Sequence, residues 1–178
     1  MLSGFYRTLM TAQSAGAALV AATVGAGVMT SLLPAQANYP LKGQAIAQIG
    51  ERLKFSAAGI LTSSATPVTV TFAVLADNTQ IWTSGAITPA VSQANASWSL
   101  DVELDVRVVG TAAQVLGIGK LGGALSGLAP ATSPGLGTAF DSTVPHVIGL
   151  GVSFGANTAG NQMTLEQYAF ASLVGAQS

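Results

Sequence analysis

The feature that most constrains the fold is an unbroken alternation of apolar and polar residues from Trp98 to Val108. Every second residue in this segment is Trp, Leu or Val, and the residues between them are Ser, Asp, Glu or Arg. Successive side chains of a β-strand point to opposite faces, so the pattern predicts a strand with one face in a core and the other in solvent. A helix would instead scatter the carboxylates of Asp101, Glu103 and Asp105 around its circumference.

Other segments show the same alternation less strictly. A turn at Asp77–Asn78 predicts a hairpin, and Gly59 marks a bulge or a close backbone contact. The further strands that we expect are 53–61, 68–74, 80–83, 144–154 and 163–173, with two short strands in 19–33 broken around Gly25 and Gly27. About eight strands without intervening helices predict an all-β fold, an antiparallel β-sandwich of jelly-roll-like type.

The length of 178 residues suits a single domain with its own core. We expect an extended N-terminal arm over residues 1–15 and one β-sandwich domain over 16–178. A Gly/Pro-rich loop is expected at about 120–143, and a connection of that length inside a compact domain usually has a function or forms contacts.

Charge is scarce in this chain. Only 7% of the residues are charged, against about 25% in an average globular protein, and the net charge is −1. A nucleic-acid-binding protein needs clustered positive charge, so we expect no nucleic-acid partner. The absence of Cys excludes disulfides and thiolate metal sites. A surface with so little charge favours association, which indicates an assembly component rather than an enzyme, with no cofactor.

An uncharged stretch runs from Thr8 to Leu41, and residues 15–34 are long and apolar enough to raise the possibility of a membrane span or signal peptide. Its Ser, Thr and Gly residues dilute the hydrophobicity, and the rest of the chain has a similar composition. We therefore favour short strands here and expect no membrane partner.

Two motifs could carry chemistry. Residues 117–122 match the G-x-G-x-x-G pattern of dinucleotide-binding loops, but no strand–helix–strand unit surrounds them, so chance in a Gly-rich chain is favoured. His146 is the single histidine, and Asp141 and Ser142 lie near it in sequence. No nucleophile-elbow pattern is present, and the alternation places His146 on an apolar strand face, so we favour a packed histidine in a core or interface.

The carboxylates of Asp101, Glu103 and Asp105 share one strand face at alternate positions. Such a row could bind Ca²⁺ or flank a glycosidic bond. The favoured interpretation is a solvated strand face, with Arg107 and Lys54 as counter-charges. We expect no metal site.

Several segments, taken in order, resemble a pattern in structural proteins of tailed bacteriophages. They are TSLLPAQANYP at 30–40, GERLKFSAAG at 50–59, VTVTF at 68–72, TSGA at 83–86, the strand from Trp98 that ends in RVVG at 107–110, GTAFDST at 137–143 and MTLEQYAFASL at 163–173. The likeness covers about residues 8–173 and carries no catalytic motif. It implies a jelly-roll virion protein that decorates heads or builds tail and neck parts, commonly as a trimer.

The function expected from this resemblance is that of a capsid decoration (cement) protein, a homotrimer bound to the major capsid protein on the capsid surface. The alternatives are a minor tail or neck component and a virion module that binds host glycans. The candidate contact residues are Tyr6, Arg7 and Trp82; Trp82 is the aromatic side chain best suited to stack on a sugar.

Overall fold

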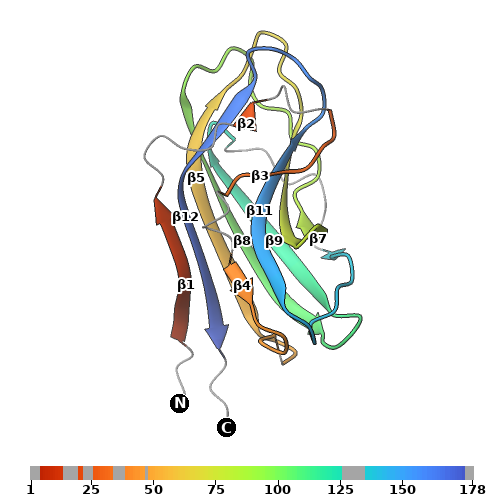
Figure 1. The fold of residues 1–178 in the computed structure, drawn as a ribbon. Helices are drawn as coiled ribbons and strands as arrows, with labels where there is room; N and C mark the ends of the chain where they lie inside the picture. The colour runs from red at the N-terminus through yellow and green to blue at the C-terminus, as the bar shows by residue number, and fades with distance from the viewer. Residues whose placement is uncertain are drawn as a thin grey trace.

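The computed structural model describes residues 5–13, 20–21, 26–33, 39–46, 48–125 and 135–174. These residues form twelve strands and no helix (Figure 1). The strands are β1 (Phe5–Gln13), β2 (Val20–Ala21), β3 (Thr30–Ser31), β4 (Tyr39–Leu41), β5 (Arg52–Thr62), β6 (Val70–Ala76), β7 (Thr79–Thr83), β8 (Ala96–Val108), β9 (Gln114–Gly123), β10 (Gly135–Leu136), β11 (His146–Phe154) and β12 (Gln162–Val174).

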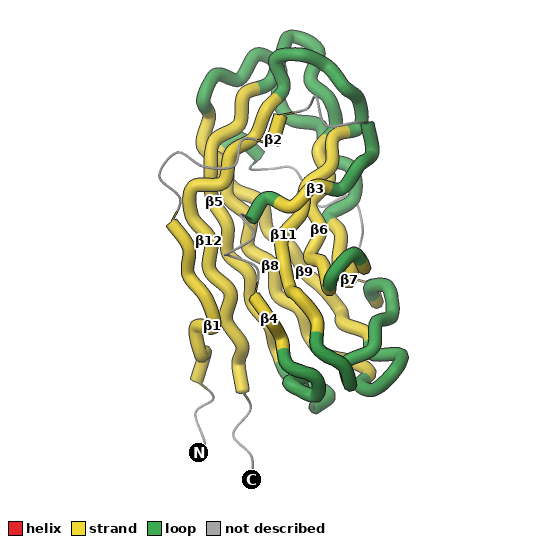
Figure 2. Tube along the Cα trace, viewed as in Figure 1, coloured by secondary structure: helices red, strands yellow, loops and turns green. Residues whose placement is uncertain are grey.

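The strands form two antiparallel sheets that pack face to face (Figure 2). A seven-stranded sheet has the order β1-β12-β5-β8-β9-β10, with β2 also paired to β12. A five-stranded sheet has the order β3-β11-β6-β7, with β4 also paired to β11. The core of this arrangement is β1-β12-β5-β8 facing β4-β11-β6-β7, which is the strand order of a jelly roll. The predicted all-β, jelly-roll-like sandwich is therefore confirmed.

Most strands lie where the alternation predicts them. The predicted strand from Trp98 to Val108 is β8, the hairpin around Asp77–Asn78 joins β6 to β7, and β2 and β3 are two short strands within 19–33. Within the interval 1–15, expected as an arm, β1 pairs with β12 along its length. The loop expected at 120–143 starts later than predicted, because β9 continues to Gly123, and it contains β10.

The core lies between the sheets and is built from every second residue of the long strands. On β8, the side chains of Trp98, Leu100, Val102, Leu104 and Val106 are all at most 1% exposed, while the residues between them face outward. Aromatic rings fill the centre: Phe55 stacks on Phe170 with centroids 4.3 Å apart, and Phe72 lies 5.2 Å from Trp98. Burial of this apolar area is the main source of stability.

Gly59 allows a close contact between β5 and β12. The indole nitrogen of Trp98 donates to the main-chain oxygen of Thr164 at 3.1 Å. A Cβ on Gly59 would collide with that Thr164 oxygen and would lie 3.0 Å from the indole nitrogen. The expected close contact at Gly59 is thus confirmed, and it leaves the Trp98 donor satisfied.

Among the described residues, none belongs to a helix with the length and hydrophobicity needed to cross a membrane.

Candidate functional site

The carboxylate row on β8 is a charged outer face of the seven-stranded sheet. Asp105 bonds Arg52 at 3.0 Å and Arg107 at 3.2 Å, and Glu103 lies 4.0 Å from Lys54. Lys54 and Arg107 are the predicted counter-charges, and this part of the prediction is confirmed. Arg52 was missed because the strand was expected to begin one residue later; the register of β5 on β8 places it opposite Asp105.

The remaining carboxylate of the row is bound by a hydroxyl. Asp101 accepts a hydrogen bond from Ser56 at 2.6 Å, and Lys120 of β9 lies opposite it in register. Each acid on this face therefore has a basic or hydroxyl neighbour. Among the described residues, no group of three or more His, Cys, Asp or Glu could hold a metal ion.

The glycines of the G-x-G-x-x-G string are packing positions. Gly117 and Gly119 lie on the inner face of β9, directly under the indole of Trp82 on β7. A Cβ on Gly119 would lie 2.6 Å from Cζ2 of Trp82, and a Cβ on Gly117 would overlap the pyrrole side of the same indole. The string lies inside the antiparallel strand β9 and not at the start of a helix, so it lacks the geometry of a dinucleotide loop.

Trp82 is consequently buried in this chain, whereas stacking on a sugar, for which it was the candidate, needs an exposed ring. Its side chain is buried with 6% exposure, because the two glycines opposite it leave a space that the indole fills. The other two candidate contact residues, Tyr6 and Arg7, lie on β1 opposite Leu173 and Ser172. Their side chains lie outside the described part of the structure.

His146 begins β11 and joins three segments that are far apart in sequence. Its Nδ1 lies 2.7 Å from the Asp77 carboxylate, and its Nε2 lies 2.5 Å from the main-chain oxygen of Asp141. The other Asp77 oxygen accepts the Val147 N–H at 2.8 Å, and Asp77 N–H donates to the Val147 oxygen at 2.8 Å. The imidazole also packs on the ring of Phe140 in a T-shaped pair, with centroids 5.5 Å apart. The expected packed histidine is found, at 11% side-chain exposure, but with polar partners.

These contacts shift the pKa values of all three groups. Burial alone would lower the pKa of His146, but its hydrogen bonds to Asp77 and to the Asp141 carbonyl outweigh burial and raise it above 6.5. The Val147 N–H, aided by His146, lowers the pKa of Asp77 below 3.8. The Thr143 hydroxyl and N–H lower the pKa of Asp141. At neutral pH both carboxyl groups are ionised.

This geometry does not form a Ser-His-Asp site. The Ser142 hydroxyl accepts from the Gly110 N–H at 3.0 Å and donates to the Gly110 carbonyl at 3.3 Å. Both nitrogens of His146 bind other oxygens, so the imidazole is not placed to take a proton from Ser142. Ser142 instead fixes the turn between β8 and β9 to the segment that precedes β11.

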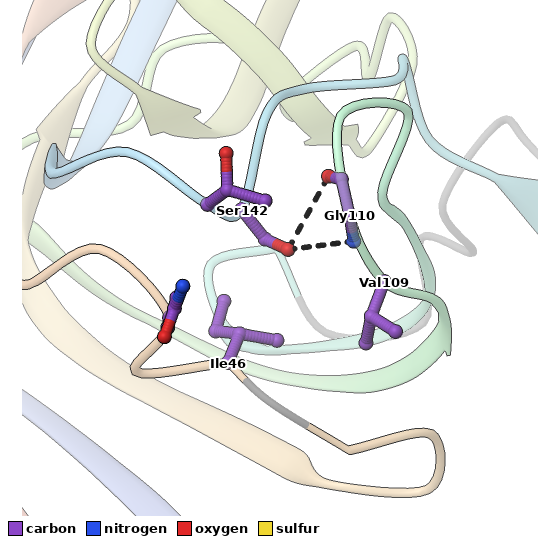
Figure 3. A pocket seen from close by; sticks show the side chains of 6 residues that line it. Ile46, Val109, Gly110 and Ser142 are labelled. Carbon is purple, nitrogen blue, oxygen red and sulfur yellow. Dashed lines mark hydrogen bonds between the residues drawn. The ribbon is translucent and has the colours of Figure 1, made fainter.

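A hollow of about 260 Å³ opens beside that contact. Figure 3 shows Ile46 and Val109 beside the hydrogen bonds between Ser142 and Gly110. The full lining is Gln44, Ile46, Val109, Gly110, Ser142 and Thr143. Its walls come from the β4–β5 connection, the β8–β9 turn and the segment before β11. Main-chain hydrogen bonds hold these walls together, including Gln44 N–H to the Ser142 oxygen at 2.9 Å.

These three connections lie together at one end of the sandwich, the lower end in Figure 1, which we call the loop end. The loop end consists of residues 42–46, 48–51, 109–113 and 137–145. In or beside it lie five large apolar side chains that are at least 36% exposed, here called the loop-end apolar group: Ile49, Val108, Val109, Val144 and Val147. Val109 is the member of this group that lines the hollow. An exposed apolar group at one end of a molecule is suited to contact another protein surface.

Comparisons of the chain with protein-family models, with curated proteins and with solved structures found no match. The function is therefore argued from the chain's own geometry.

Proposed function

We propose that this chain is a structural protein of a tailed-bacteriophage particle, a capsid decoration protein that forms a homotrimer on the outer surface and binds the major capsid protein. It acts by burying surface between protein copies and not by catalysis. The observation that carries the proposal is the strand order of the two sheets, β1-β12-β5-β8 against β4-β11-β6-β7. Jelly rolls of this kind are a common architecture of viral capsid domains.

One fold can serve many functions, so the proposal also needs support from the surface of the molecule. The loop-end apolar group places five exposed Ile and Val side chains at one end of the molecule. Seven of the thirteen charged residues lie instead on the outer face of β5, β8 and β9: Arg52, Lys54, Asp101, Glu103, Asp105, Arg107 and Lys120. The outer face of β5, β8 and β9 is thus the solvated face, while the loop end combines its exposed apolar side chains with Lys42, Glu51 and Asp141. We assign the contact between copies to the loop end.

Light scattering coupled to size-exclusion chromatography tests self-association. The expected mass is three times the chain mass of 17.7 kDa. Val109→Asp places a charge beside the hollow and is expected to give a monomer that is still folded by circular dichroism. Ile118→Asp is the matched control: Ile118 is 52% exposed on the charged face of β9, and the trimer should persist. A wild-type monomer refutes the proposed trimer.

The place in the particle is tested by quantitative mass spectrometry of particles purified from a culture that produces this chain. A decoration protein is expected at a copy number close to that of the major capsid protein. A few copies per particle would indicate the tail or neck instead. Absence from the particles would overturn the proposal.

A further inference from the structure

The two hydrogen bonds of His146 indicate its protonation state. Nδ1 faces a carboxylate oxygen of Asp77, and Nε2 faces the main-chain oxygen of Asp141, at 2.7 and 2.5 Å. A main-chain carbonyl oxygen can only accept a hydrogen bond, and an ionised carboxylate can only accept as well. Both ring nitrogens must therefore donate. Neutral imidazole has one N–H and one bare lone pair, so only the imidazolium satisfies both contacts.

The groups that surround His146 favour this charge. Asp77 reaches it from the β6–β7 turn, and Asp141 lies in the segment before β11. From β4, the residue opposite His146 is Leu41, and the cation that follows, Lys42, is exposed. Two carboxylates thus lie near the imidazole, and both of its hydrogen bonds are to oxygen atoms.

The contacts add to others that already join these segments, because β6 pairs with β11 and the Asp77 N–H donates to the Val147 oxygen. Asp77 is 69 residues from His146 in sequence and holds both polar atoms of the Val147 main chain, while Asp141 immediately precedes Ser142, which lines the hollow. Loss of one proton removes one of the two contacts, because a lone pair would then face an oxygen.

We propose that the protonation of His146 controls two contacts at the loop end. When the imidazole is charged, it holds the β6–β7 turn and the segment 137–145 to the start of β11. When it loses its proton, one of these two contacts opens. Val144 and Val147, two members of the loop-end apolar group, flank His146, so the arrangement of exposed apolar residues changes with pH. The inference concerns the isolated chain and does not depend on the proposed function.

The single histidine makes the test direct, because the chain gives one set of imidazole signals. Long-range ¹H–¹⁵N correlation spectra of the wild-type protein should show both nitrogens protonated at pH 6. The signals should titrate with a midpoint above 6.5, the ordinary value. A neutral tautomer at pH 6, or a midpoint at or below 6.5, overturns the proposal.

The variant Asp77→Asn distinguishes a role of the His146 charge from a role of its packing alone. An Asn side chain can still accept from the Val147 N–H while its NH₂ group donates to Nδ1 of a neutral imidazole, and Asn tolerates the positive φ of 53° at this position. The variant should fold, with the His146 midpoint below that of the wild type. A fall of one pKa unit corresponds to a tenfold change in the protonation equilibrium.

Hydrogen exchange gives the structural readout. In the wild type, the Val147 amide reports the contact with Asp77, and the Ser142 amide reports the segment that holds the Asp141 carbonyl. The protection of one of these two amides should fall as pH rises through the His146 midpoint, relative to the amide of Val102 at the centre of β8. In Asp77→Asn this dependence should vanish. Protection of both amides that follows Val102 at every pH in the wild type would refute the opening of either contact, whatever the midpoint.

Discussion

The indole of Trp82 on β7 lies over Gly119 on β9, in the space that the Cβ of any other residue would occupy. This contact joins the two sheets near their shared edge. It also explains why a strand in the middle of the chain carries glycine on its inner face at positions 117 and 119.

Gly119→Ala is expected to lower the free energy of unfolding by about 1–3 kcal/mol, the usual cost of overpacking a core. Urea denaturation followed by fluorescence measures the change. Trp82→Phe removes the ring atoms that Gly119 faces, so the alanine substitution should cost less in that background. An equal cost in both backgrounds would show that the indole is not the cause. Ile118→Ala, exposed between the two glycines, is the control and should have little effect.

Trp98→Phe should destabilise the protein by about 1–3 kcal/mol, because it leaves the Thr164 carbonyl at the β5–β12 contact without its donor. The lost volume of the indole adds to this cost, since Trp98 is 1% exposed. Thermal denaturation by calorimetry gives the comparison with wild type. A variant as stable as the wild type would mean that the hydrogen bond and the packing at this point are both dispensable.

Stability should depend on pH through the His146 cluster. The pKa of His146 is raised on folding, so its stabilisation is complete below pH 6.5 and is lost as pH rises through the higher folded value. The pKa of Asp77 is lowered, so its stabilisation is present above pH 3.8 and is lost as pH falls through the lower folded value. The cluster therefore favours folding most between these two pH values. Urea denaturation from pH 6 upward should show less pH dependence for His146→Gln than for wild type.

Asp105→Asn should cost only about 0.2–1 kcal/mol, although Asp105 contacts two arginines. Both arginine side chains are about half exposed, so water screens the attraction. Denaturation in low and high salt measures the effect, and salt should shrink the difference between variant and wild type. A loss of several kcal/mol would show that this face is covered in the folded protein.

Strands with regular alternation could be predicted from the sequence because burial on one face leaves a period of two. β8 extends the predicted segment by two residues at its start, and β5 differs from its prediction by one residue at each end. β9 could not be recognised in this way. Gly117 and Gly119 take inner positions that other strands give to Val or Leu, so the alternation disappears.

The candidate site was less accessible to prediction, because its contacts join distant segments. Nothing local to His146 indicates Asp77, which lies 69 residues away. Trp82 looked like a surface aromatic because the space that receives it is made by residues more than thirty positions later. By contrast, Lys54 and Arg107 could be predicted, since the first lies on a neighbouring strand and the second on the same one.

The position of β12 between β1 and β5 has a consequence for the order of folding. Of the strands that the structure describes, β1 leaves the ribosome before all others, and its partner β12 leaves after all others. Until β12 arrives, β5 presents an unpaired edge eleven residues long, and exposed edges of this kind promote aggregation. Removal of β12 would thus separate β1 from the rest of the sheet and leave the edge of β5 exposed.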